Sequence, residues 1–165
     1  MHGKWNDSMK EVKGDIWEFH ADGEWIVIPT NGDTNRFGLA VMGRGLAKEA
    51  TKMIPGIAYG LAQMLNHYGN HVAWFTDIKL IAFPVKHHWH EEADLDLIRQ
   101  SAKELVDLTA GMKGPFYLPM VGCGNGRRKW DEVRPILAAE LDDRFFVITE
   151  APIDRRHWVG DSQYS

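Results

Sequence analysis

The sequence is poor in cysteine and has no long apolar run. Among its 165 residues there is one cysteine, Cys123, which excludes an intramolecular disulfide and any metal site built from several cysteines. No apolar run approaches the ~20 residues of a transmembrane helix, and residues 1–7 lack the apolar stretch of a secretory signal. We therefore expect a cytoplasmic protein, without a membrane partner, that forms one domain over residues 1–165.

Positive charge is also scarce. The chain has 19 Lys plus Arg against 23 Asp plus Glu, so its formal net charge is -4 and a generic electrostatic attraction to nucleic acid is disfavoured. Two phosphate-binding fingerprints are missing as well. Lys48 occupies the place of the third glycine in a dinucleotide motif that would begin at Gly43, and no Gly-Lys-Ser/Thr P-loop occurs. A Rossmann dehydrogenase and a P-loop NTPase are therefore disfavoured.

Strand and helix patterns alternate through most of the chain. Apolar runs predict strands at residues 9–12, 25–28, 71–75, 78–83, 116–120 and 145–149, two of which are expected to end at Pro29 and Pro84. Helical spacing predicts helices at residues 46–53, 57–67, 95–108 and 131–141, with Asp94 as a cap and Pro135 in a first turn. Two strands would then precede the first helix. The alternation predicts an α/β domain with a sheet between helical layers, a core at about residues 9–149 and a tail at 151–165.

Two glycine-rich loops, at residues 41–45 and 122–126, each follow a strand and precede a helix. In open α/β sheets, ligands bind outside the carboxyl ends of the strands. Glycines at that place let backbone N–H groups approach a phosphate beside a helix N-terminus. The loops therefore predict a ligand that carries phosphate, although either loop could also be only a tight turn.

Five motifs resemble those of the macro domain family. They are Lys13-Gly-Asp-Ile16, Thr30-Asn31, Val41-Met-Gly-Arg-Gly-Leu-Ala47, Phe83-Pro-Val-Lys86 and Leu118-Pro-Met-Val-Gly-Cys-Gly-Asn-Gly126. Over about residues 9–149 they are most similar to the branch of DNA ADP-ribosyl glycohydrolase antitoxins and terminal-ADP-ribose glycohydrolases. The resemblance implies a three-layer α/β/α macro domain with a central mixed sheet that binds ADP-ribose at the carboxyl ends of the strands. No cofactor and no metal are expected.

The same resemblance implies roles for individual residues. Asp15, helped by the Ile16 backbone, would bind the adenine amino group, and Asn31 would face the distal ribose. The alternatives are a plain turn residue and a loop-capping asparagine. Two loops would enclose the diphosphate and distal ribose, with Met42, Gly43, Arg44 and Gly45 on one side and Val121, Gly122, Cys123, Gly124, Asn125 and Gly126 on the other. We interpret Cys123 as a small buried side chain rather than a nucleophile, because the motif places no general base beside it.

Lys86 follows a strand end, at the position where this branch carries a functionally required lysine. We predict Lys86 and Asn31 to be the catalytic residues. Lys86 could orient the distal ribose, stabilise charge as the glycosidic bond breaks or, once deprotonated, act as a base or nucleophile; the alternative is a surface lysine. Relatives with a lysine nucleophile have an aspartate where this chain has Asn125, which argues against a lysyl adduct. The segment at residues 32–40 is also longer than in the antitoxins.

Two further clusters are candidates for binding. His87-His-Trp-His90 could hold zinc together with Glu91 or Glu92, or could form a solvent-facing aromatic loop that stacks on a nucleobase. The run Arg127-Arg-Lys129 is either a solvated face or a contact for a polyanionic carrier such as DNA. Trp25 and Trp130 are predicted in the core or at its rim, and Trp158 in the tail could cover an edge.

The function predicted from these residues is binding of ADP-ribose and its hydrolysis from a modified substrate, with nucleic acid favoured over protein. The expected partners are ADP-ribose or an ADP-ribosylated substrate, including ADP-ribosylated DNA, and the expected state is a monomer. Three alternatives remain: a reader module that binds ADP-ribose without chemistry, a phosphatase acting on ADP-ribose 1''-phosphate, and an unrelated nucleotide-binding enzyme.

Overall fold

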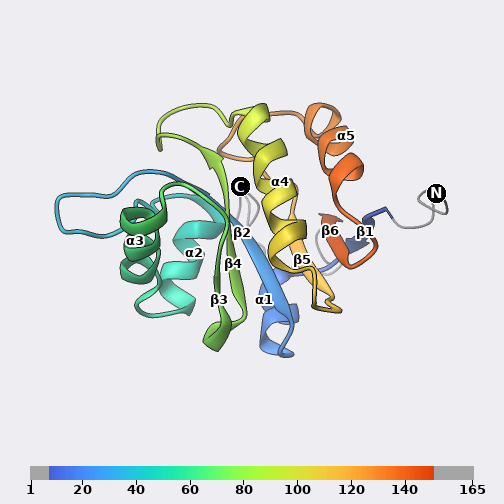
Figure 1. Cartoon of the computed structure of the whole chain (residues 1–165), viewed down its shortest axis with the longest axis horizontal. Helices are drawn as coiled ribbons and strands as arrows, with labels where there is room; N and C mark the ends of the chain where they lie inside the picture. The colour runs from blue at the N-terminus through green and yellow to red at the C-terminus, as the bar shows by residue number, and fades with distance from the viewer. Residues whose placement is uncertain (1–7, 151–165) are drawn as a thin grey trace, which may run out of the picture.

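A six-stranded mixed sheet with helices on both faces forms the domain (Figure 1). The computed structural model describes residues 8–150, so the tail at 151–165, with Trp158, lies outside the described residues. The elements in chain order are β1 (Lys10–Lys13), α1 (Ile16–Ala21), β2 (Trp25–Asn31), α2 (Gly45–Met53), α3 (Ile57–Tyr68), β3 (Ala73–Phe75), η2 (Thr76–Ile78), β4 (Leu80–Lys86), α4 (Leu95–Leu108), β5 (Phe116–Pro119), α5 (Trp130–Glu140) and β6 (Phe145–Glu150). No helix within residues 8–150 is long and apolar enough to cross a membrane.

The sheet has the strand order β1-β6-β5-β2-β4-β3. Every neighbouring pair is parallel except β3 with β4, which is antiparallel. The carboxyl ends of β2, β4 and β5 therefore meet at the same edge of the sheet, and the loops that follow them are neighbours there. This arrangement confirms the predicted mixed sheet.

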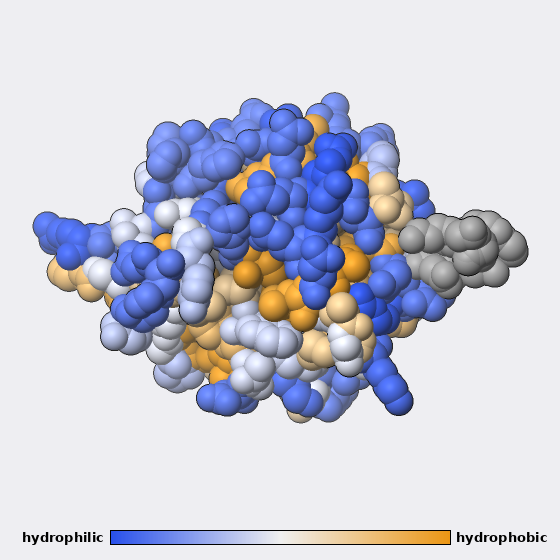
Figure 2. Space-filling view, in the orientation of Figure 1, coloured by the Kyte–Doolittle hydropathy of each residue, from blue (hydrophilic) through white to orange (hydrophobic). Residues whose placement is uncertain are grey.

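Alternate residues of the strands enter two separate cores, because successive side chains in a strand point to opposite faces. Val27 packs into a core shared with α4 and α5, whereas Ile26 and Ile28 pack into a core shared with α1, α2 and α3. Figure 1 shows α4 and α5 together on one side of the sheet and α2 and α3 on the other. Figure 2 shows hydrophilic residues across the outward face of α4, which carries the exposed Arg99 and Lys103. The three predicted layers are confirmed.

Most predicted strands and helices are confirmed, with ends shifted by at most three residues. The prediction that two strands precede the first helix is wrong, because α1 lies between β1 and β2. Its six residues are too few to show a helical period in the sequence. Asp15 caps it by accepting the Trp17 N–H, and the fully buried Ile16 packs it against the sheet. Tertiary packing therefore stabilises a helix that would be marginal alone.

Pro29 and Pro84 do not end their strands, which corrects a second prediction. β2 and β4 both continue past their prolines. The Ile26 N–H donates to Lys79 O, on the side of β4. Because successive residues of a central strand direct their backbone groups to alternate neighbouring strands, the backbone of Pro29 faces β5. β5 pairs with only the first two residues of β2. Likewise, β3 pairs with β4 no further than Ala82. Each proline thus lies beyond the end of a neighbouring strand, where a missing N–H costs no ladder hydrogen bond.

Pro135 also differs from its predicted place. It is the sixth residue of α5, beyond the first turn, because the helix already begins at Trp130. The Glu132 carboxylate accepts the Lys129 N–H at 2.9 Å and so fixes this earlier start. Both Pro135 and Asp131 are exposed, so water can hydrate the carbonyl of Asp131 that the proline leaves without its helical donor.

Candidate functional site

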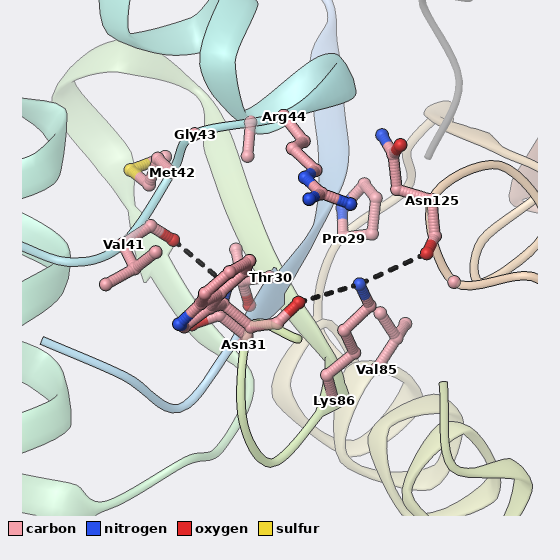
Figure 3. A pocket seen from close by; sticks show the side chains of 13 residues that line it. Pro29, Thr30, Asn31, Val41, Met42, Gly43, Arg44, Val85, Lys86 and Asn125 are labelled. Atoms are coloured by element: carbon pink, nitrogen blue, oxygen red, sulfur yellow. Dashed lines mark hydrogen bonds between the residues drawn. The ribbon is translucent and has the colours of Figure 1, made fainter. Parts of the chain in front are cut away.

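A cleft opens at the carboxyl ends of β2 and β4, where β5 no longer pairs with β2. Its cavity volume is about 340 Å³, within the range of small-molecule sites. Residues from β2, β4, the start of α2 and the loops beside them line it: Pro29, Thr30, Asn31, Val41, Met42, Gly43, Arg44, Ala47, Val85, Lys86, Trp89, Asn125 and Gly126 (Figure 3). Both glycine-rich loops therefore reach one cleft, as their positions after neighbouring strands predict.

Lys86 is the charged group at the bottom of this cleft. It is the last residue of β4 and only 7% exposed, so the alternative of a surface lysine is wrong. Its Nζ donates to two backbone carbonyls, Trp89 O at 3.1 Å and Asn125 O at 3.2 Å. Burial, together with the charges of Arg44 and Arg127, lowers the pKa of Lys86 from its ordinary value. The site therefore favours the neutral amine more than water does.

The first glycine-rich loop lies open to the cleft. Arg44 is the N-cap residue of α2 and, within the described part of the chain, gives that helix no side-chain cap. Its guanidinium lies over the Trp89 ring, 5.5 Å from the ring centroid. Figure 3 shows Arg44 and Lys86 reaching into the cleft from opposite sides. Two cations and the positive end of the α2 dipole thus converge on one cavity, which is an environment for an anion.

The second glycine-rich loop is folded on itself. The N–H groups of Cys123, Arg127 and Arg128 donate to Met120 O, Gly124 O and Gly122 O, respectively. Val121 and Gly122 are buried, and of the whole loop only Asn125 and Gly126 line the cleft. Figure 3 shows the Asn125 carbonyl directed at Lys86 and the Asn125 side chain directed away from it. This loop therefore meets the cleft mainly through its backbone.

Cys123 has the surroundings of an inert thiol. Burial and then the charge of Glu132 raise its pKa to about 11, and Sγ donates to Val121 O at 3.6 Å. A thiol with so high a pKa is rarely present as the nucleophilic thiolate at neutral pH. The interpretation of Cys123 as a small filling side chain agrees with this environment.

The Asn31 side chain lines the cleft but is partly used by its own loop. Its Nδ2 donates to Val41 O at 3.0 Å, and its Oδ1 accepts the Asp33 N–H at 2.9 Å. These are the bonds of a loop-capping asparagine, the alternative to a ribose contact. One N–H and one lone pair of the amide are left over for a ligand.

Asp15 and Ile16 do not line the cleft. Asp15 caps α1 through the Trp17 N–H at 2.9 Å, and the Ile16 side chain is fully buried. Gly45, Val121, Gly122, Cys123 and Gly124 are likewise absent from the described lining. The structure therefore brings together Asn31, Met42, Gly43, Arg44, Lys86, Asn125 and Gly126 from the predicted set. A role for the others in ligand binding stays a prediction.

The loop between β4 and α4 carries the histidine cluster. Within residues 8–150 no group of three potential ligands is placed to hold a metal ion. His87 Nε2 instead lies 2.8 Å from Asp94 Oδ2, and His88 Nδ1 lies 2.9 Å from Asp33 Oδ1. Trp89 is the member of the cluster that lines the cleft. These contacts argue against the zinc interpretation.

Asp33 is a residue of this region that the sequence did not single out. Its Oδ2 accepts the Trp89 N–H at 2.8 Å while its Oδ1 faces His88. Burial alone would raise the pKa of Asp33, but the Trp89 N–H and His88 outweigh it and lower the pKa. Asp33 and Trp89 are 56 residues apart, so no sequence signal connects them.

The basic run at residues 127–129 divides into different roles. Arg128 is half-buried and its Nε donates to Ala93 O at 2.7 Å, so it holds the start of α4 against the second loop. Arg127 and Lys129 are exposed, and Arg127 donates to His90 O at 3.3 Å. Trp25 and Trp130 pack against the core, as predicted. A contact between the run and a polyanionic carrier stays a prediction.

No protein-family model matches the chain, and no curated protein matches its sequence. Solved structures do match. The macrodomain of Mycobacterium tuberculosis DarG is 21% identical over 84% of this chain and 96% of its own, with a TM-score of 0.65. The macrodomain of Thermus aquaticus DarG is 22% identical over 85% of this chain and 97% of its own, with a TM-score of 0.62. Thermosipho africanus DarTG in complex with ADP-ribose is 20% identical over 90% of this chain but 43% of its own, with a TM-score of 0.65.

Proposed function

We propose that this chain, which has the macrodomain fold, binds ADP-ribose in the cleft and hydrolyses it from a modified substrate. One observation carries the proposal. Lys86 is a buried cation whose Nζ has only neutral carbonyl partners among the described residues, and it lies across the cleft from Arg44. Burial without an opposite charge disfavours the charged form of Lys86, so its amine is more readily neutral than in water and can accept a proton in the cleft that Arg44 also faces.

The diphosphate is proposed to lie against the first loop and the start of α2. Donors to a charged oxygen contribute about 1.5–3 kcal/mol each, so a few backbone N–H groups with Arg44 suffice for an anion on a chain of net charge -4. The distal ribose would then reach Asn31, whose remaining N–H and lone pair match sugar hydroxyls. Lys86 lies on the next strand, beside the same sugar.

The proposed reaction is dissociative cleavage at the anomeric carbon of the distal ribose. The bond to the carrier breaks with its electron pair on the leaving atom, and water adds to the sugar and loses a proton. Asn31 and Lys86 align the sugar, and the neutral form of Lys86 can take the proton of the water at Nζ. We do not propose a lysyl adduct, because the side chain at position 125 is an amide rather than a carboxylate and is directed away from Lys86, which Asn125 contacts only through its backbone carbonyl (Figure 3).

Nucleic acid is the proposed carrier, in preference to protein. The cleft is lined by the exposed ring of Trp89 and the exposed cation of Arg44, and the exposed Arg127 donates to His90 O beside Trp89. Aromatic rings stack on unpaired bases, and cations contact phosphates, so together they suit a single strand such as ADP-ribosylated DNA. The overall negative charge restricts this attraction to the rim.

The second candidate is a reader that binds ADP-ribose without turnover. The engaged amide of Asn31 favours it, because its hydrogen bonds to Val41 and Asp33 serve the loop. Three substrates in parallel separate these functions: ADP-ribosylated single-stranded DNA, ADP-ribosylated protein and ADP-ribose 1''-phosphate. Release of ADP-ribose from DNA supports the proposal, phosphate release identifies a phosphatase, and calorimetric binding of ADP-ribose without any product identifies a reader.

Lys86→Ala tests the catalytic part of the proposal. We expect turnover to fall roughly hundredfold or more, the usual contribution of a general base. ADP-ribose affinity should stay within about tenfold, or 1.4 kcal/mol, by calorimetry. Lys86→Arg keeps the charge but cannot provide a neutral base, so it should be as inactive as the alanine variant. Lys103→Ala, on the outward face of α4, is the matched control. Unchanged turnover in Lys86→Ala would remove this residue from the reaction.

A further inference from the structure

Both acceptors of Lys86 are backbone carbonyls on loops, so the position of its Nζ depends on where those loops lie. One acceptor, Trp89 O, belongs to the loop at residues 87–93 between β4 and α4. The residues around it, at 87–90, are exposed, so burial does not fix the loop in place. Hydrogen bonds from other segments hold these residues: the Gly32 N–H donates to His87 O at 3.2 Å and Arg127 donates to His90 O at 3.3 Å, while His88 and Trp89 between them contact Asp33.

Asp33 is the side chain from another segment that holds this loop at two points. Its two carboxylate oxygens are used separately, Oδ2 by the Trp89 N–H at 2.8 Å and Oδ1 by His88 Nδ1 at 2.9 Å. The Asp33 side chain is itself only 22% exposed. The Trp89 N–H therefore donates to Asp33, and the Trp89 carbonyl accepts a hydrogen bond from the Lys86 amine.

Asp33 is well anchored for this role. Its N–H donates to Asn31 Oδ1 at 2.9 Å and its carbonyl accepts the Val41 N–H at 2.9 Å. Both partners line the cleft. Asp33 thus connects three parts of the site: the end of β2, the first glycine-rich loop and the loop that supports Lys86.

We infer that Asp33 is a positioning residue, which sets the place of the Lys86 amine through Trp89. The inference rests on the proposed function, in which Lys86 acts on the distal ribose. Asp33 does not line the cleft within the described residues, so its loss is expected to act on the reaction step more than on ADP-ribose binding.

The test compares Asp33→Ala with His87→Ala. His87 belongs to the same loop and has a similar contact with a carboxylate, at 2.8 Å from Asp94, but it neither lines the cleft nor contacts Trp89 through any described hydrogen bond. We expect kcat of Asp33→Ala to fall roughly tenfold to hundredfold, as for a misplacement of about 1 Å, with KM and ADP-ribose affinity changed less than about threefold. Asp33→Asn, whose amide oxygen can still accept the Trp89 N–H, should recover most of kcat. His87→Ala should resemble the unmodified protein.

A second measurement follows Lys86 without turnover. The rate of reductive methylation of its amine, read by mass spectrometry of the peptide that contains it, should rise in Asp33→Ala and not in His87→Ala. If no substrate is turned over by the unmodified protein, the proposed function fails while this rate still tests the positioning. Asp33→Ser keeps the backbone contacts and replaces the alanine variant if that variant does not fold. Equal kcat and equal methylation in the Asp33 and His87 variants would overturn the inference, as would a parallel loss of kcat and affinity.

Discussion

The two glycine-rich loops look alike in the sequence but differ in the structure. The loop at residues 41–45 is open, contributes Met42, Gly43 and Arg44 to the cleft and ends at a helix start without a side-chain cap. The loop at residues 122–126 is closed by its own hydrogen bonds, and the helix after it begins with the Lys129 N–H held by Glu132. The first loop lies open along the cleft, whereas the second is folded back by the N–H groups of Arg127 and Arg128, which donate to its Gly124 and Gly122 carbonyls.

The glycines of the two loops are therefore needed for different reasons. A Cβ on Gly126 would lie 2.5 Å from Gly122 O, which is backbone and cannot move aside. A Cβ on Gly43 would meet nothing within 4 Å. Glycine at residue 126 allows the chain to fold back on itself, and glycine at residue 43 leaves space in front of the cleft. The same residue type thus marks internal packing in one loop and room for a ligand in the other.

The largest effect that would separate the loops is on folding. Gly126→Ala should lower the free energy of unfolding by about 1–3 kcal/mol, the usual cost of overpacking, measured by denaturant titration. Gly43→Ala should leave that free energy within about 1 kcal/mol, because the alanine has space and the unfolded chain loses entropy. It should instead weaken ADP-ribose binding, because its methyl group stands where the ligand is proposed to lie.

Calorimetry with ADP-ribose completes this comparison. In a Gly126→Ala protein that still folds, ADP-ribose affinity at low temperature should fall less than in Gly43→Ala, because the added Cβ meets the Gly122 backbone rather than open space in the cleft. Equal stability of the two alanine variants would show that the second loop is as open as the first and would remove the distinction.

Much of the fold follows from the sequence, because long periodic segments and buried strands are local signals. The segment Leu95–Leu108 shows this best, since Asp94 caps it as predicted and its apolar spacing gives both ends. The short α1 was missed because six residues carry no period and its stability comes from the burial of Ile16. The strand ends at Pro29 and Pro84 were missed because the cost of a proline depends on how far the neighbouring strand extends.

The candidate site was predictable where one motif supplies it and not where distant segments meet. Lys86, Arg44 and Asn125 are named by motifs and do converge on the cleft. Asp33 is not, because its partner Trp89 lies 56 residues away. The difference between the two loops also escaped prediction, since the spacing of glycines does not tell whether the chain after them folds back and donates to their carbonyls.

A smaller effect would sharpen the role of the open loop in holding an anion. Arg44→Met should weaken ADP-ribose binding by about threefold to tenfold, or up to 1.4 kcal/mol, because it removes an exposed cation that faces the cleft. The effect should shrink at high salt, where exposed charges are screened. Lys48→Met removes the same charge one turn further along α2 and outside the described lining, so it is the matched control. Equal losses in the two variants would indicate a general field rather than a contact from the open loop.

The smallest effect concerns the amine that connects β4 to the closed loop. Burial and the charges of Arg44 and Arg127 lower the pKa of Lys86 in the folded protein, so between that pKa and its ordinary value of 10.5 the unfolded chain binds more protons than the folded one. The free energy of unfolding of the unmodified protein should therefore rise relative to Lys86→Met as the pH increases through the alkaline range toward 10.5. Below the folded pKa, the difference in free energy of unfolding between the unmodified protein and Lys86→Met should be constant.

In an Arg44→Met background the rise of this difference with pH should be smaller, because one of the charges that lowers the pKa of Lys86 is gone. Denaturant titrations of the four proteins at several pH values measure it, and a difference that does not vary with pH would mean that the amine is hydrated rather than buried between β4 and the closed loop.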